Sequence, residues 1–228
     1  MRTPRRDGGY SLIEVLVAMV IASTVLGLVT AAMIGMLRNG ASAGSRLANL
    51  DQIRIGVDAL SKNLRTAVRP EQLNSTCVSS CPAAFETATD TRVVFYANVG
   101  DKIGTKPAPT RITYTIAADP NDATGTTAAV TETRQQVAST WTSGDYTWAT
   151  GATRTISRGI TWPLPSSNGP LFTYYTGSNG AIVTSPAPSG SILATIASIR
   201  IALPVGDSTH PSPGVSTSVF LPNSTLGH

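Results

Sequence analysis

The N-terminal part of the chain is dominated by one long stretch of apolar residues. Residues 15–37 form a run of 23 positions without a charged side chain, and a single carboxylate, Glu14, comes directly before them. At 1.5 Å per residue, a helix of this length is about 35 Å long, which is enough to cross about 30 Å of hydrocarbon. The pattern therefore predicts a transmembrane helix.

Helical periodicity continues beyond this stretch, but on one face only. Apolar residues recur at spacings of 3 or 4, and most charged residues fall between them. Because Pro70 interrupts the pattern, we expect one helix from residue 11 to residue 69, whose amphipathic half covers residues 38–69. A juxtamembrane coiled coil is the alternative. The apolar positions are Leu47, Leu50, Ile53, Val57, Leu60 and Leu64.

After residue 70 the pattern changes to short β-type runs separated by turns. Residues 92–99 and 111–116 are the clearest strands, and the Gly- and Pro-containing link between them predicts a hairpin with a long loop. Residues 192–203 and 215–221 are expected to pair with each other across a second loop. Weaker strands are expected at residues 129–135, 154–161, 171–175 and 181–184.

The charges near the N-terminus predict how the chain crosses the membrane. Arg2, Arg5 and Arg6 precede the apolar stretch, so the positive-inside tendency keeps the N-terminus in the cytoplasm and places the C-terminal domain outside. The formal net charge of the whole chain is +4, which is weak evidence for a nucleic-acid partner.

Glu14 is the unusual feature of this segment, because a carboxylate is costly in lipid and therefore indicates a function. Two simpler interpretations remain open. A secretory signal with cleavage after residues 41–43 (Ala-Ser-Ala) would not need so long an apolar stretch, and a plain uncleaved anchor explains neither Glu14 nor Gly8 and Gly9.

Residues 9–14 (Gly-Tyr-Ser-Leu-Ile-Glu), together with the basic leader and the apolar stretch, resemble the processing site of type IV prepilins and pseudopilins. In that family a prepilin peptidase cuts after a Gly and methylates the new N-terminus, and a Glu occupies the fifth mature position. The resemblance implies cleavage between Gly9 and Tyr10, with Tyr10 becoming the N-methylated first residue and Glu14 the fifth. The family more often has Phe where this chain has Tyr10.

The resemblance also implies a role for Glu14 in assembly. In the family this carboxylate is thought to pair with the N-terminal amine of a neighbouring subunit, which would set how far one helix slides past the next. The alternative is a carboxylate that reaches the lipid headgroups. Partners implied by the resemblance are the prepilin peptidase, other pilin or pseudopilin subunits and the inner-membrane assembly platform, with DNA or an exported protein as a ligand at the tip.

The fold implied by the resemblance is α+β and pilin-like, with a long N-terminal helix packed on a mainly antiparallel sheet. Residues 1–9 would be the cleaved leader and 10–37 the transmembrane and assembly helix. Residues 38–69 would be the amphipathic helix and 70–228 the extracytoplasmic β-rich domain. The paired terminal strands and the closing residues 219–223 are also similar to large minor pilins and to the J-type pseudopilins of type II secretion.

Few residues of the β-rich part suggest chemistry. Cys77 and Cys81 are expected to form a local disulfide outside the cytoplasm, with free thiols or intermolecular bridges as alternatives. Residues 119–122 (Asp-Pro-Asn-Asp) are interpreted as a turn rather than a calcium site. The cluster of Trp141, Tyr146 and Trp148 is interpreted as packing rather than a binding surface.

No motif of nucleophilic, phosphate-binding or metalloprotease chemistry is present, so we expect no enzyme, metal or cofactor. The sequence favours a minor type IV pilin or pseudopilin assembled near the tip of a pilus or pseudopilus. The alternatives are a pseudopilin of a DNA-uptake or type II secretion system, and a single-pass membrane-anchored surface-binding protein that does not assemble.

Overall fold

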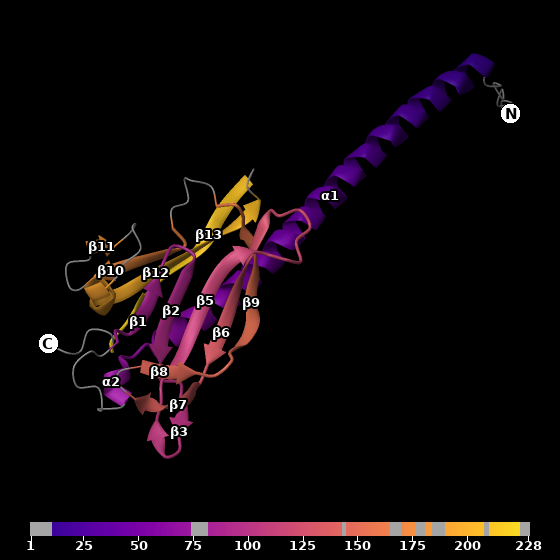
Figure 1. Cartoon of the computed structure of the whole chain (residues 1–228). Helices are drawn as coiled ribbons and strands as arrows, with labels where there is room; N and C mark the ends of the chain where they lie inside the picture. Colours follow the sequence, from indigo (N-terminus) through magenta and orange to yellow (C-terminus); the bar gives the residue numbers. More distant parts are fainter. Residues whose placement is uncertain are drawn as a thin grey trace, which may run out of the picture. The chain divides into compact units, whose positions relative to one another are not determined.

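The computed structural model describes residues 11–73, 82–142, 145–164, 170–176, 181–183, 190–207 and 210–223. The chain divides into two compact units, residues 1–45 and 46–228. Helix α1 (Leu12–Leu64) begins in the first unit and ends in the second (Figure 1).

The first unit consists of the apolar part of α1. Its segment Leu12–Gly40 has a mean hydropathy of 2.5, and none of its residues is buried. By length and composition this segment can cross a membrane, as the sequence predicts.

In the second unit, the remainder of α1 packs its apolar face into the core. Ile53, Val57, Leu60 and Leu64 are buried, and Leu50 packs against them, which confirms most of the amphipathic stripe. Leu47 is 64% exposed, so the stripe begins one turn later than the spacing predicts.

The prediction that α1 continues to residue 69 is wrong, because the chain joins the sheet after Leu64. The backbone N–H of Val68 donates to Tyr96 O, and the N–H of Asn98 donates to Thr66 O, both at 2.9 Å. Pro70 then opens the short helix α2 (Pro70–Leu73), where its missing N–H costs nothing.

The second unit is built on a nine-stranded sheet with the order β1-β2-β5-β6-β9-β12-β10-β11, and β13 pairs with the remaining edge of β12. All neighbouring strands in this sheet are antiparallel (Figure 1). The strands are β1 (Phe85–Ala88), β2 (Arg92–Ala97), β5 (Thr110–Ala118), β6 (Thr127–Gln135), β9 (Ala152–Thr161), β10 (Phe172–Thr176), β11 (Ala181–Val183), β12 (Ile196–Asp207) and β13 (His210–Phe220).

This sheet has two leaves. The first leaf contains β1, β2, β5, β6 and β9, and the second contains β10, β11, β12 and β13. Within the described residues, the strands of the two leaves form one backbone pair, Ile160 on β9 with Val205 on β12, and the N–H of Phe172 on β10 donates to Asp90 O in the β1–β2 turn at 3.1 Å. One hydrophobic core contains side chains from α1 and from both leaves, so side-chain packing joins the leaves more than the hydrogen-bond ladder does.

The α+β fold class with a mainly antiparallel sheet is confirmed, as are the β2–β5 and β12–β13 pairings. The expected strand over residues 192–203 starts late, because Gly190–Thr195 forms the 3-10 helix η2. Sequence patterns did not predict β1 or the two small hairpins. These hairpins are β3 (Lys102–Ile103) with β4 (Lys106–Pro107), and β7 (Val137–Thr142) with β8 (Asp145–Trp148).

A glycine allows α1 to approach the first leaf closely. A Cβ atom at Gly56 would lie 2.6 Å from Ser157 Cβ, and the Ser157 hydroxyl donates to Gln52 O of the same helix at 3.3 Å. The absence of a side chain at Gly56 therefore sets the distance between α1 and β9.

Candidate functional site

The start of α1 is defined by a serine cap. Ser11 Oγ accepts a hydrogen bond from the backbone N–H of Ile13 at 3.2 Å, and Ser11 O accepts from the N–H of Glu14 at 3.0 Å. Ser11 is therefore the N-cap, with its hydroxyl bonded to the second helical N–H, and Glu14 is the third helical residue, which is the Ser-x-x-Glu spacing of a capping box. The Ser-x-x-Glu spacing is visible in the sequence, but a helix cap at Ser11 was not predicted from it.

Glu14 lies in the first turn of α1, where the free N–H groups and the helix dipole favour a carboxylate by about 0.3–1 kcal/mol. It lines a shallow groove on the helix surface with Val15, Ala18, Met19 and Ala22. Ala18 and Ala22 follow Glu14 at helical spacing on one face, so the carboxylate stands at the end of a face of small side chains.

The other polar side chains in the apolar segment are satisfied within the helix. Ser23 Oγ donates to Val20 O at 2.9 Å, Thr24 Oγ1 to Ile21 O at 2.8 Å and Thr30 Oγ1 to Leu26 O at 2.8 Å. Hydroxyls bonded in this way suit an apolar surrounding, where an unpaired polar group is costly. Glu14 is the one ionisable residue between positions 12 and 37.

The other site residues expected from the sequence, Gly9, Tyr10, Cys77 and Cys81, lie outside the described residues. The cleavage site and the Cys77–Cys81 disulfide therefore stay predictions. Of the expected set, the structure places Glu14 alone.

Comparison with known proteins finds a family motif in the N-terminal segment. The model of the family described as "Prokaryotic N-terminal methylation motif" matches residues 4–30. No curated protein matches the chain significantly. The motif is followed by the apolar helix and the α+β domain, an arrangement similar to that of membrane-anchored prepilins. The chain thus carries the N-terminal methylation motif of type IV prepilin-like proteins, and this motif implies processing by prepilin peptidase and assembly with other pilins.

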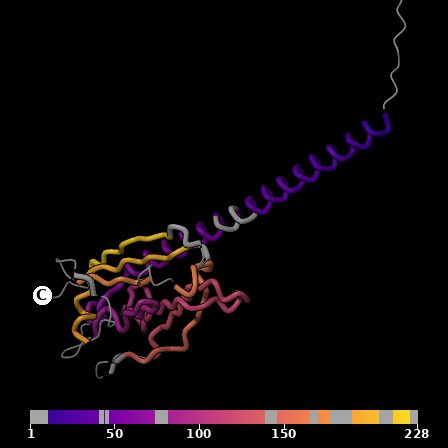
Figure 2. Tube along the Cα trace, turned by 90° about the horizontal axis from the view of Figure 1, so that it is seen from above, coloured from indigo at the N-terminus to yellow at the C-terminus, as the bar shows by residue number. Residues whose placement is uncertain are grey.

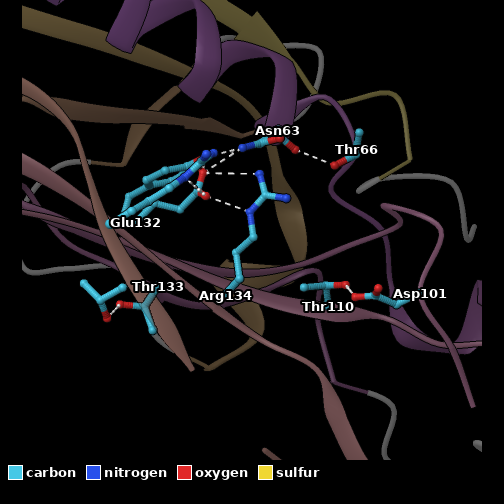
Figure 3. A network of polar contacts seen from close by, with 10 residues as sticks. Asn63, Thr66, Asp101, Thr110, Glu132, Thr133 and Arg134 are labelled. Carbon is cyan, nitrogen blue, oxygen red and sulfur yellow. Dashed lines mark hydrogen bonds and ion pairs between the residues drawn. The ribbon is translucent and has the colours of Figure 1, made fainter. Parts of the chain in front are cut away.

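A second polar site, inside the β-rich domain, ties the end of α1 to the sheet (Figure 3). Glu132 on β6 is fully buried, and its Oε2 accepts hydrogen bonds from Tyr114 Oη at 2.7 Å and from Asn63 Nδ2 at 2.9 Å. Its Oε1 accepts from Nε of Arg134 at 2.7 Å and from Nε of Arg154 at 2.9 Å. Three strands and α1 thus converge on one carboxylate.

The charge of this carboxylate is stabilised by its donors. Burial alone would raise the pKa of Glu132, but hydrogen bonds from Arg134, Tyr114 and Arg154 outweigh it and hold the pKa below its usual range. Burial raises the pKa of the Tyr114 phenol, so Tyr114 stays a donor. The cluster consequently fixes Asn63, near the end of α1, against β5 and β6.

A polar pocket of about 340 Å³ lies at the same end of the first leaf, and Arg134 is one of its lining residues. Its charged groups are already paired. Asp101 accepts from Gln136 Nε2 at 3.1 Å and from the Thr110 hydroxyl, while Arg134 is bound to Glu132. Among the described residues, each charged side chain of the pocket therefore already has a hydrogen-bond partner.

Two other predicted features have structural roles. Trp148 stacks on Tyr96 with ring centroids 5.6 Å apart and contacts Tyr146 at 5.7 Å, which confirms packing for these residues. Asp119 accepts from the N–H of Asn121 at 2.9 Å and pairs with Arg158, as expected of a turn. Among the described residues, no group of three or more His, Cys, Asp or Glu could hold a metal ion.

Proposed function

We propose that this protein is a minor type IV pilin or pseudopilin that assembles near the tip of a pilus or pseudopilus. The observation that carries the proposal is the lone carboxylate, Glu14, one turn inside a helix whose exposed surface is otherwise uncharged up to Leu37, within a matched methylation motif.

The surface of the helix supports assembly. Leu12, Leu28 and Met36 are 82, 72 and 76% exposed, and the exposed face includes many more large apolar side chains. Such a surface is stable in lipid or against other apolar helices, but not in water. Subunits that leave the membrane must therefore bury it against neighbouring helices, and Glu14 then needs a cation, which the N-terminal amine of a neighbouring subunit would supply.

The tip position is proposed on steric grounds. The β-rich unit spans residues 46–228, and a wide head is difficult to pack repeatedly around a thin helical core. Immunogold labelling of the native filament tests this. We expect label at filament ends, and dense label along the shafts would overturn the tip position.

The first test of processing is the mass of the N-terminal peptide of the native membrane-extracted protein. A chain that begins at Tyr10 with one added methyl group is the expected result. A start at Gly44 would indicate ordinary secretion, and an intact N-terminus would indicate a simple anchor. Either of these would refute the proposal.

A charge reversal separates an assembling subunit from a plain anchor. Glu14→Lys should abolish incorporation into filaments while leaving membrane insertion intact. Asp51→Lys is the matched control, because it makes the same change on an exposed position of the same helix. If Glu14→Lys assembles as well as Asp51→Lys does, Glu14 has no role in assembly.

A further inference from the structure

Strand β13 forms an open margin of the sheet. It pairs with β12 and with no other strand among those the structure describes. Figures 1 and 2 show it in yellow at the margin of the second leaf. Open edges attract other strands, and proteins usually protect them with charges, bulges or short length.

The other margins of the sheet carry such protection. Strand β1 has a register shift and an exposed charged residue, Glu86, which pairs with Arg111 on β5. Strand β11 has three described residues, and the free part of β9 carries Arg154 and Arg158. In β13, residues 215–220 (Val-Ser-Thr-Ser-Val-Phe) pair with β12 without a shift and contain no charge and no proline.

The hydrogen-bond pattern identifies which backbone groups are free. The N–H of Leu221 donates to Ala197 O at 2.9 Å, and bonded and non-bonded pairs alternate along an antiparallel ladder. Val215, Thr217 and Val219 thus bond to β12, whereas Ser216, Ser218 and Phe220 direct their N–H and C=O groups outward. These three residues are also exposed, and Phe220 is 65% exposed.

A charged side chain next to this edge has no partner among the residues that the structure describes. Arg200 lies opposite Ser218 in the β12–β13 register and is exposed. No described residue forms an ion pair or hydrogen bond with its guanidinium group. Because Ser216 and Ser218 are small, an arginine on β12 can reach across them to a strand added beyond β13.

We propose that the β13 edge binds an extended segment of another protein chain as an added strand, with a carboxylate that pairs with Arg200. On the added strand, the outward side chain two positions from this carboxylate would be apolar and would contact Phe220. The inward side chains of the added strand would be apolar as well, because the half-buried Val215 and Thr217 line the inner side of the β13 edge. A second copy of β13 does not meet this description, because residues 215–220 contain no carboxylate.

The test uses the full chain in detergent micelles and a synthetic blocked heptapeptide, Thr-Val-Glu-Val-Leu-Val-Thr. The matched control peptide has Lys in place of Glu. Residue-resolved hydrogen exchange should show that the Glu peptide slows the amides of Ser216, Ser218 and Phe220 by at least about tenfold. The Lys peptide should need at least about ten times the concentration for the same effect.

Two variants make the test specific. Arg200→Glu should reverse the preference, so that the Lys peptide protects the edge and the Glu peptide does not. Ser218→Pro removes one outward N–H without touching the bonds to β12, and should abolish protection by the Glu peptide. Equal binding of both peptides, an unchanged preference in Arg200→Glu, or no protection at these amides would overturn the proposal. Protection that needs no peptide and rises with protein concentration would mean that a second copy covers the edge, and would overturn it as well.

Discussion

The buried carboxylate of Glu132 allows one prediction to be worked out in detail. Glu132→Gln preserves the size and shape of the side chain and removes its charge. The amide oxygen can still accept from Tyr114 and Asn63, but the amide N–H₂ group then faces the two guanidinium donors that bonded to Oε1. The substitution therefore removes two charged hydrogen bonds and places the new amide donor against the guanidinium donors of Arg134 and Arg154.

The magnitude follows from the exposure of the arginines. Breaking a buried ion pair usually costs about 3–5 kcal/mol. The side chains of Arg134 and Arg154 are 38 and 61% exposed, so water can solvate them after the substitution and the cost falls toward the lower end. We expect the free energy of unfolding to fall by about 3 kcal/mol. With a urea m-value of about 2 kcal/mol/M, the midpoint would fall by about 1.5 M.

The assay is urea unfolding of the full chain in micelles, followed by tryptophan fluorescence. Glu86→Gln is the matched control, because Glu86 is a partly exposed carboxylate paired with Arg111. An exposed ion pair contributes about 1 kcal/mol or less, so the control should move the midpoint much less. Equal shifts in the two variants would refute the idea that Glu132 holds α1 on the sheet.

Three further predictions concern packing and pH. Gly56→Ala should lower the free energy of unfolding by about 1–3 kcal/mol, since its Cβ would meet Ser157, whereas Gly44→Ala, with nothing within 4 Å, should be neutral or stabilising in the same urea assay. Leu60→Ala should cost about 2–5 kcal/mol and Leu47→Ala less than about 0.5 kcal/mol, and similar values would contradict the observed burial. Arg111 lowers the pKa of Glu86, and Arg158 lowers the pKa of Asp119. Burial would raise the pKa of Glu132, but its hydrogen-bond donors outweigh burial and lower it. The contribution of these three carboxylates to stability is therefore present above about pH 4 and lost as the pH falls through the folded-state pKa values, so thermal midpoints should drop on acidification, and less steeply in Glu132→Gln.

The long helix and most strands were predictable because they depend on local periodicity. The periodic apolar residues of α1 and the β-branched and aromatic runs of β2 and β5 indicate helix and strand directly, because these signals lie within one segment of the chain. The late start of β12 was harder to predict from the sequence. Residues 192–195 are apolar enough for a strand but form part of η2.

The Glu132 cluster shows why a site of this kind was missed. Glu132 lies on the inward-facing side of β6, two residues from buried Val130, and this was the one local sign of burial. Its partners Tyr114 and Asn63 precede it by 18 and 69 residues and meet it through strand register and helix packing. Neither the register nor the packing can be read from a single strand's pattern. In the assembly segment, Ser11 was overlooked although its capping pattern is local.

The single backbone pair between the two leaves has a mechanical consequence. A ladder resists shear because many hydrogen bonds must break together, but at Ile160 and Val205 there is one pair. A force that pulls the leaves apart is therefore resisted by this pair, by the bond from the Phe172 N–H to Asp90 O, and above all by the side chains packed between the leaves. We therefore expect the resistance of the domain to such a force to depend more on the size and fit of these core side chains than on a hydrogen-bond ladder.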